Sequence, residues 1–257
     1  MQRSYVVTGG GRGVGRAVVE RLLDAGSSVV VVELDPDALG WVERHAAGPR
    51  VAGVVGDAAD SQVTEAAADR AEALGRLAGW VNNAAVFRDA ALDTAPAAEV
   101  LGLVAVNLAA AVTGCATAVR HFLARGTAGG IVNVSSHQAQ RAVRGALPYV
   151  VAKAAIEGLT RAAAVDHGPA GIRVNAVALG SIRTERYDAL LAEQGPDGAL
   201  HVQRSMAQLH PLGRVGSAGE AAAVIAFLLS EEAGFVSGAV LPVDGGRAAR
   251  GADPEEA

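Results

Sequence analysis

Short apolar runs rich in valine alternate with stretches of helical periodicity along this chain, and the alternation constrains the fold more than any other feature. Residues 28–33 form a continuous valine run, typical of a strand buried on both faces of a parallel sheet. Val14, Val18 and Leu22 follow the first glycines at helical spacing. We therefore expect a doubly wound parallel α/β sheet with right-handed crossovers and helices on both faces.

About seven strands are expected, at residues 5–7, 28–33, 50–55, 77–82, 131–134, 172–178 and 239–243. Helices are expected at residues 14–25, from Asp35-Pro36 onward, and at 60–74, 97–125, 148–167 and 217–230. No internal repeat divides the chain, so we expect one domain over residues 1–257. Residues 184–211 break the alternation, and a connection of that length is usually a lid or binding loop. We place the lid at 183–211 and expect a polar, frayed tail at 247–257.

Composition narrows the class of protein. The net charge is −5 without a basic run, which argues against a nucleic-acid surface. The single cysteine, Cys115, excludes an internal disulfide and a cysteine-based zinc site, and we expect an inert buried thiol and no metal. We expect neither a signal peptide nor a membrane-spanning run, and therefore a cytoplasmic protein with a small-molecule substrate.

A glycine-rich loop lies between the first strand and the first helix. Gly9, Gly13 and Gly15 would let the backbone approach a pyrophosphate at the helix N-terminus, although the spacing is GxxxGxG rather than GxGxxG. Glu33 ends the second strand about twenty residues later, where an acid can bond a ribose 2′-hydroxyl. Together these features predict a dinucleotide site.

The same region bears on the choice of cofactor. The Glu33 carboxylate would repel a 2′-phosphate, and the neighbouring Leu34 is not basic. Arg12, in the glycine loop, could instead meet that phosphate. We favour NAD(H) and leave NADP(H) open.

Three polar residues that can move a proton follow the fifth strand. Tyr149 and Lys153 are four residues apart, which places them on one face of a helix. An ammonium that close would lower the tyrosine pKa from about 10, so that the phenol could exchange a proton with an alcohol or carbonyl. Ser136 could hold the same oxygen. A buried tyrosine beside a surface lysine is the structural alternative.

In this order the motifs resemble those of the short-chain dehydrogenase/reductase family of the classical type, over residues 5–246. The loop from Thr8 to Gly15 resembles the family's cofactor loop, and Asn82-Asn-Ala-Ala85 resembles its NNAG motif with Ala for the final Gly. Ser136 lies thirteen residues before Tyr149, the family's usual spacing, and is therefore preferred to Ser135. Further landmarks are Asp57, an adenine-contacting acid in the family, and the segments 172–178, 211–214 and 243–246.

The resemblance implies a Rossmann fold and a catalytic tetrad of Asn107, Ser136, Tyr149 and Lys153. In it, Tyr149 is the general acid/base, Lys153 lowers its pKa and holds the ribose, Ser136 positions the substrate oxygen, and Asn107 maintains a water relay. The implied cofactor residues are Gly9, Arg12, Gly13, Val14, Gly15, Glu33, Leu34, Asp57, Ala58, Asn83, Ala84, Tyr149, Lys153, Gly180, Ile182 and Thr184. The family is usually tetrameric, so a homo-oligomer, tetramer or dimer, is expected.

One residue departs from the family pattern. Leu179 stands where the family usually has proline, before the loop that by resemblance contacts the nicotinamide amide through Ile182 and Thr184. Proline fixes φ, so leucine could leave that loop looser.

The substrate is the least determined part. Candidate contacts are His137, Gln138, Arg144 and Tyr187, with Gln140 and Arg141 nearby. Arginines that could bind a substrate carboxylate or phosphate are Arg88, Arg144, Arg183 and Arg186, although most loop arginines are solvated.

The leading hypothesis is an NAD(H)-dependent oxidoreductase acting on a secondary alcohol or ketone. An NADPH-dependent 3-oxoacyl-carrier-protein reductase is the alternative within the class. From another class, a redox sensor could keep the nucleotide fold without turnover.

Overall fold

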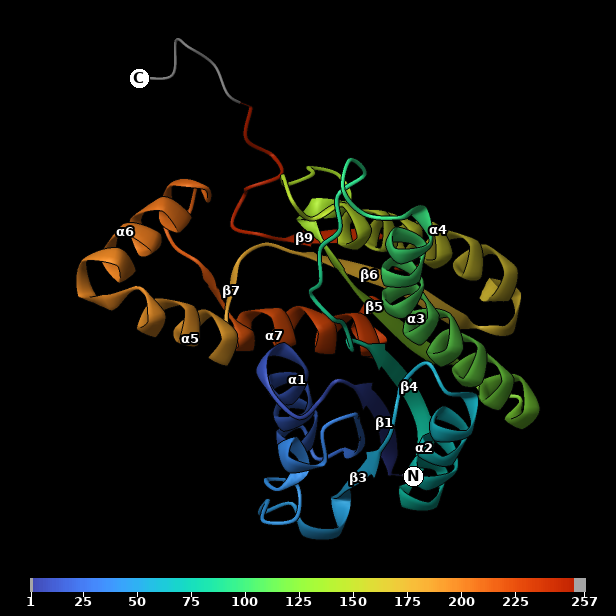
Figure 1. The fold of residues 1–257 in the computed structure, drawn as a ribbon. Helices are drawn as coiled ribbons and strands as arrows, with labels where there is room; N and C mark the ends of the chain where they lie inside the picture. Colours follow the sequence, from blue (N-terminus) through green and yellow to red (C-terminus); the bar gives the residue numbers. More distant parts are fainter. Residues whose placement is uncertain (1, 252–257) are drawn as a thin grey trace.

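A seven-stranded parallel sheet runs through the middle of the molecule (Figure 1), with the strand order β3-β2-β1-β4-β5-β6-β9. The computed structural model describes residues 2–251. The strands are β1 Arg3–Thr8, β2 Ser28–Glu33, β3 Val51–Val55, β4 Arg76–Asn82, β5 Gly129–Ser136, β6 Ile172–Leu179 and β9 Val240–Val243. The predicted sheet of about seven parallel strands is confirmed.

Helices cover both faces of the sheet. They are α1 Gly13–Asp24, α2 Ser61–Leu74, α3 Ala97–Arg125, α4 Leu147–His167, α5 Glu185–Glu193, α6 Gly195–Gln208 and α7 Ala218–Leu229. Residues of α1 and α7 form one apolar core with one face of the sheet, and residues of α2, α3 and α4 form a second core with the other face. The fold is therefore three-layered.

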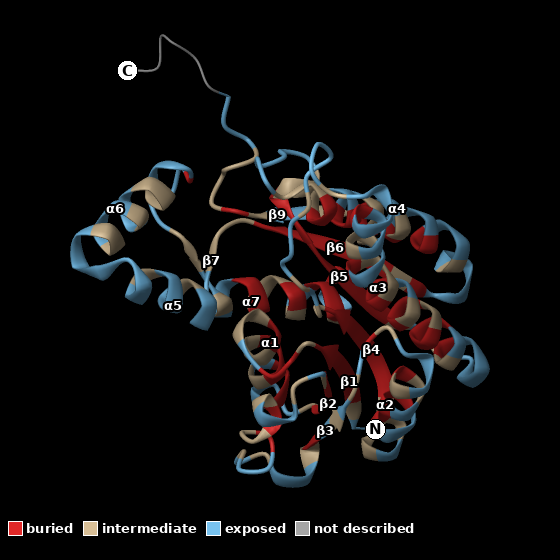
Figure 2. Ribbon diagram, viewed as in Figure 1, coloured by how far each residue is buried: buried red, intermediate tan, exposed pale blue. Residues whose placement is uncertain are grey.

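The valines of β2 show how the sequence builds these two cores. Val29 and Val31 belong to the core under α1 and α7, whereas Val30 and Val32 belong to the other. Successive side chains of a strand point to opposite faces, so an unbroken apolar run is what a doubly covered strand requires. Figure 2 shows the buried strands between the two helix layers.

Two expectations about the connections are wrong. Asp35 caps only the short 3₁₀ turn Pro36–Leu39, not a long helix, because Leu39 is the single buried residue that it supplies. The 183–211 segment is not an irregular loop: it begins at the second residue of the short strand β7 Ile182–Arg183 and contains the helices α5 and α6, which project from the body of the fold (Figure 1). Strand β7 pairs with β8 Gly216–Ser217 in a separate two-stranded sheet.

The expectation of no membrane-spanning run also needs correction. Residues 100–119 carry no charged side chain, and α3 is long and apolar enough to cross a membrane, with a mean hydropathy of 1.9. Yet α3 packs on the sheet, and its Cys115, Ala118 and Phe122 belong to the core. Of the expected frayed tail, residues 247–251 lie within the described part of the chain and 252–257 lie outside it.

Candidate active site

The residues singled out by sequence gather at one edge of the sheet. Thr8, Glu33, Asn82, Ser136 and Leu179 are the last residues of β1, β2, β4, β5 and β6. In doubly wound sheets, ligands bind outside these carboxyl ends, where the strand order reverses. The order reverses here between β1 and β4, so the glycine loop after β1 and Asn82 of β4 flank the candidate site.

The glycine loop lies so close to its neighbours that side chains would not fit. Gly9 has φ +63°, and a Cβ there would lie 2.8 Å from the Cα of Ala84. A Cβ on Gly15 would lie 2.1 Å from the carbonyl oxygen of Gly9. Both positions therefore require glycine, and the backbone at the start of α1 is left bare enough for a phosphate to approach.

Side chains from β1 and the β4–α3 connection fix this loop. Asn83 donates from Nδ2 to the carbonyl oxygens of Thr8 (3.1 Å) and Gly9 (2.8 Å). The Thr8 hydroxyl accepts from the backbone N–H groups of Asn83 and Ala84, each at 3.1 Å. Asn83 and Ala84, expected at the cofactor, thus shape the loop.

A carboxylate lies at the N-terminus of α1. The N–H of Gly13 donates to Oε2 of Glu185, the first residue of α5, at 3.0 Å. First-turn N–H groups lack partners within a helix, and their partial positive charge attracts anions. Because this helix end accepts an oxyanion and is lined by obligatory glycines, the residues present fit a dinucleotide pyrophosphate.

The acid at the end of β2 is bound to the same loop. Oε2 of Glu33 accepts from the N–H of Gly11 at 3.0 Å, and Oε1 accepts from the N–H of Leu34 at 3.0 Å. Arg12 forms an ion pair with Asp35. Leu34 is 64% exposed, while Asp57 and the buried Ala58 follow β3. A carboxylate therefore stands where the second strand ends, and the one basic side chain of the glycine loop is paired with Asp35.

Tyr149, Ser136 and Lys153 come together between β5 and α4. Ser136 accepts a hydrogen bond from the N–H of Gln138 at 3.2 Å and so caps the turn His137–Ala139. Lys153 is buried, and its Nζ donates to the carbonyl oxygen of Val134 at 2.7 Å. Burial raises the pKa of Tyr149 to about 12, opposed by its hydrogen bond with Ser136 and by the charge of Arg186. Burial lowers the pKa of Lys153 to about 8.

Lys153 is not among the groups that shift the pKa of Tyr149 in this structure, and its predicted lowering of that pKa stays a prediction. The ammonium lies 5.3 Å from the centroid of the Tyr149 ring and is directed to the Val134 carbonyl. Burial of the phenol therefore dominates its proton affinity.

Asn107, the fourth predicted catalytic residue, holds the chain after β4. Its Oδ1 accepts from the N–H of Val86 at 2.9 Å, and its Nδ2 donates to the Val86 carbonyl at 3.1 Å. Its Nδ2 also donates to the Leu103 carbonyl at 3.5 Å, so the amide is engaged with the backbone of two residues. A polar network that sequence reasoning missed lies beneath α4: the buried carboxylate of Glu157 accepts from the Ser135 hydroxyl (3.1 Å) and from Gln140 Nε2 (3.2 Å).

The predicted substrate residues do not form one cluster. His137 is buried, its Nδ1 bonds the Leu179 carbonyl at 3.1 Å, and burial lowers its pKa. Its Nε2 and the Gln138 Oε1 are buried without a hydrogen-bond partner among residues 2–251. Arg144 is exposed, and Tyr187 is half-buried on α5. His137 and Gln138 therefore border Ser136, whereas Tyr187 lies on α5.

Sequence reasoning missed Phe87, which connects α5 to Tyr149, the predicted general acid/base. The Phe87 ring lies 4.9 Å from the Tyr149 ring at a tilt of 30°, and Cζ of Arg186 lies 4.1 Å from the Phe87 centroid.

One signal within the site was available from composition: Lys153 is the only lysine in a chain that otherwise uses arginine for its basic residues.

Leu179 is held firmly in the sheet and does not loosen the start of the loop that follows it. It is a regular residue of β6, paired with Ser136 and Val243, and its side chain belongs to the core. The N–H of Gly180 donates to the Val243 carbonyl at 3.0 Å. Ile182 packs against the same core, and Thr184 is the residue that precedes α5.

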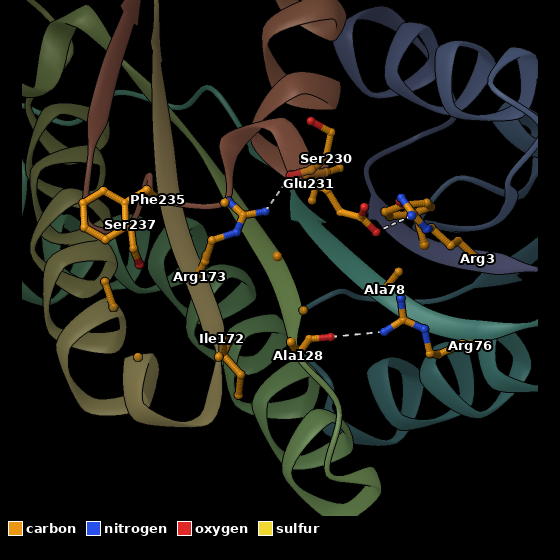
Figure 3. Close-up of a pocket in the computed structure, with 18 residues that line it drawn as sticks. Arg3, Arg76, Ala78, Ala128, Ile172, Arg173, Ser230, Glu231, Phe235 and Ser237 are labelled. Atoms are coloured by element: carbon orange, nitrogen blue, oxygen red, sulfur yellow. Dashed lines mark hydrogen bonds and ion pairs between the residues drawn. The ribbon is translucent and has the colours of Figure 1, made fainter. Parts of the chain in front are cut away.

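A groove of about 520 Å³ lies at the opposite edge of the sheet, where β1, β4, β5 and β6 begin (Figure 3). Its arginines are engaged with the protein: Arg3 pairs with Glu231, and Arg173 donates to the carbonyl oxygens of Leu228 and Ser230. These side chains tie the last helix to the sheet, so we do not assign the catalytic chemistry to this groove.

Comparisons with known proteins agree with this geometry. The family model described as "Enoyl-(Acyl carrier protein) reductase" matches residues 9–248. Levodione reductase from Leifsonia aquatica is 33% identical over 253 residues, which is 96% of this chain and 94% of that protein. The 2,5-dichloro-2,5-cyclohexadiene-1,4-diol dehydrogenase of Sphingobium indicum is 36% identical over 250 residues, 95% of this chain and 96% of that one.

Solved structures show the same fold. The crystal structure of levodione reductase matches with a TM-score of 0.87 at 32% identity and covers 97% of this chain and 98% of that one. The structure of ElxO with NADP bound matches with a TM-score of 0.88 at 25% identity, covering 97% and 100%.

Proposed function

Because this chain belongs to the short-chain dehydrogenase/reductase family, we propose that it interconverts a secondary alcohol and a ketone with NAD(H). In the oxidation the carbinol carbon loses a hydride with both electrons of its C–H bond, the hydroxyl loses its proton, and the C–O bond becomes C=O. Bound NAD⁺ supplies the hydride acceptor, and NADH supplies the donor for the reverse reaction. The products are a ketone, NADH and a proton.

The observation that carries the proposal is the hydrogen bond between Ser136 and Tyr149, at the same edge of the sheet as the glycine loop. Tyr149 gives its proton to the ketone oxygen or takes one from the alcohol, and the Ser136 hydroxyl holds that oxygen in place. A tyrosine with a raised pKa carries its proton at neutral pH, which is the form that ketone reduction needs. Oxidation becomes easier as the pH rises toward that pKa.

Lys153 and Asn107 support this pair. The Lys153 ammonium has three donors, of which one binds the Val134 carbonyl, so two remain for the ribose hydroxyls. Asn107 fixes Val86, next to Phe87, and so shapes the wall facing Tyr149. We assign Asn107 a positioning role here.

The preference for NAD(H) rests on charge at the end of β2. A carboxylate at Glu33 would repel a 2′-phosphate and can bond a ribose hydroxyl. The competing basic residue, Arg12, is paired with Asp35. Both observations support NAD(H) over NADP(H).

The test is a fluorescence titration of the wild type with NADH and NADPH, repeated with Glu33→Gln and with Glu43→Gln as an exposed control. We expect at least tenfold tighter binding of NADH, a preference that Glu33→Gln reduces and Glu43→Gln leaves unchanged. Equal affinities in the wild type would contradict the role of Glu33.

The NADPH-dependent reductase remains the second candidate, since ElxO, a structural neighbour, has NADP bound and the matching family model is described as a carrier-protein reductase. A preference for NADPH in the same titration would favour it. Binding of a cofactor without turnover of any alcohol or ketone would favour the sensor.

A further inference from the structure

The guanidinium of Arg186 lies above the catalytic tyrosine, separated from it by one aromatic ring. Arg186 is the second residue of α5, and its Cζ is 4.1 Å from the Phe87 ring centroid. Phe87 lies in turn 4.9 Å from the Tyr149 ring. The charge of Arg186 acts on the pKa of Tyr149, so the lid places a cation within electrostatic reach of the reacting oxygen.

This cation has no anionic partner within residues 2–251. The acids nearest to it in sequence are used elsewhere: Glu185 accepts from the N–H of Gly13, and Asp188 pairs with Arg183 at 2.8 Å. Arg186 forms no ion pair or hydrogen bond within the described residues, although the chain has 27 acidic residues against 22 basic ones. An unpaired arginine is therefore not explained by a shortage of acids.

Stacking on Phe87 prepares this guanidinium for an anion. A guanidinium that rests its face on an aromatic ring keeps its N–H donors at the edge, where they can bind an oxyanion through two parallel hydrogen bonds. Phe87 is 55% exposed, so the stack stands at the surface rather than within the core. A substrate whose reacting oxygen meets Tyr149 would thus have a cationic donor a short distance beyond it.

We propose that Arg186 binds an oxyanion group of the substrate, so that the preferred substrates are small secondary alcohols or ketones carrying a carboxylate or similar anion a few bonds from the reacting carbon. The inference rests on the proposed function and adds the substrate class. The simpler account, in which Arg186 is a solvated lid residue, makes the opposite prediction for a matched pair of substrates.

The test compares two hydroxy acids, 2- and 3-hydroxybutyrate, with their methyl esters, using the wild type and NAD⁺. Each ester keeps the alcohol and removes the charge. We expect at least a tenfold higher kcat/KM for an acid than for its ester. Arg186→Gln should lower kcat/KM for the acid at least tenfold, mainly through KM, and change the ester less than threefold. Arg204→Gln, which removes an exposed arginine on α6, is the matched control and should change neither.

Two results overturn the inference: no preference for acids in the wild type, or an equal loss for acid and ester in Arg186→Gln. Turnover of the neutral esters in these cases leaves the proposed function intact. If no compound is oxidised, the proposed function fails, and calorimetric titration of the NADH-saturated protein still decides the inference. Binding of an acid that Arg186→Gln weakens tenfold supports it, and undiminished or undetectable binding overturns it.

Discussion

Burial favours the neutral form of both Tyr149 and Lys153, the two central titratable groups of the site. It raises the pKa of Tyr149 to about 12 and lowers that of Lys153 to about 8. At neutral pH the tyrosine therefore holds its proton while the lysine remains mostly charged. In the proposed reaction, Tyr149 is then in the form that donates a proton to a ketone oxygen.

The buried ammonium of Lys153 should cost stability. Between pH 8 and 10.5 the unfolded chain binds a proton at this lysine more readily than the folded chain, so stability should rise with pH across that window. Below pH 8 Lys153 is charged in both states, and its burial destabilises the folded chain to the full extent. Lys153→Met should therefore abolish turnover yet raise the melting temperature at pH 7 by about 2 °C or more, as measured by calorimetry. A clear fall in melting temperature would contradict this account, and Lys153→Arg, which keeps a charge in the same space, should not stabilise.

At the scale of elements, the first turn of α5 connects both halves of the site. Glu185 bonds the glycine loop, and Arg186 lies over Phe87 against Tyr149. The first turn of α5 therefore contacts both the predicted cofactor loop and Phe87, which packs against Tyr149.

If a cofactor pyrophosphate binds at α1, the carboxylate of Glu185 competes with it for the N–H of Gly13. Glu185→Gln should bind NADH more tightly, by about three- to tenfold, because it removes negative charge from a helix N-terminus that attracts anions. Glu193→Gln, at the other end of the same helix, serves as the control. Fluorescence titration measures both, and weaker NADH binding by Glu185→Gln would show that the carboxylate assists rather than competes.

A charged cluster joins α2 to α3. His121 lies between Glu65 (2.8 Å) and Glu72 (3.0 Å), and these acids also pair with Arg120 and Arg125. Burial lowers the pKa of His121, but the two carboxylates outweigh it and the net shift is upward. Burial likewise raises the pKa of Glu65 and Glu72, but their hydrogen bonds with the arginines and His121 lower both overall.

These shifts define a pH window. Protonated His121 stabilises the folded state fully when the pH is below its unfolded pKa of about 6.5. This stabilisation is lost as the pH rises through the raised folded pKa. The ionised carboxylates of Glu65 and Glu72 stabilise the folded state fully above about pH 4.5. This stabilisation is lost as the pH falls through their lowered folded pKa values. His121→Gln should lower the melting temperature by about 2–4 °C more at pH 5.5 than at pH 8.5. An equal loss at both pH values would indicate a packing effect instead.

Sequence pattern was sufficient for the elements that bury apolar side chains. The valine run of β2 and the apolar spacing of α1 identify their elements because the core requires them. Helices α5 and α6 contain no buried residue, so no apolar stripe marks them. The Asp35-Pro36 start signal is real, but the buried residues needed to continue a helix do not follow it.

The candidate site could likewise be predicted only in part. Ser136, Tyr149 and Lys153 were identified by spacing, and the structure brings them together. The pKa of Tyr149 could not be predicted from the sequence. Helical spacing shows that Tyr149 and Lys153 are close, but it shows neither the burial of the phenol nor the direction of the ammonium. Phe87 was missed since its contact with Tyr149 joins segments far apart in sequence.

At the scale of the whole molecule, α3 and α4 both expose large apolar side chains. Leu101, Val112 and Leu123 on α3 are exposed, as are Val151 and Val165 on α4. Large apolar faces on a folded chain mark contact surfaces. We propose that these faces form the contacts of a homo-oligomer.

Light scattering after gel filtration tests the oligomer. The wild type should elute as a dimer or tetramer of the 25.8 kDa chain. Val112→Asp combined with Val151→Asp should shift it toward the monomer, because two carboxylates would be buried in the contact. Leu200→Asp, at an exposed position on α6, is the control. A monomeric wild type would contradict the assignment.

The most direct test of the central claim is the turnover of Tyr149→Phe, measured beside its affinity for NADH. The substitution removes the hydroxyl and keeps the ring against Phe87. We predict that oxidation of secondary alcohols and reduction of ketones fall at least a hundredfold, while NADH binds within about threefold of the wild type. A variant that keeps a tenth or more of the wild-type rate would show that Tyr149 is not the proton donor.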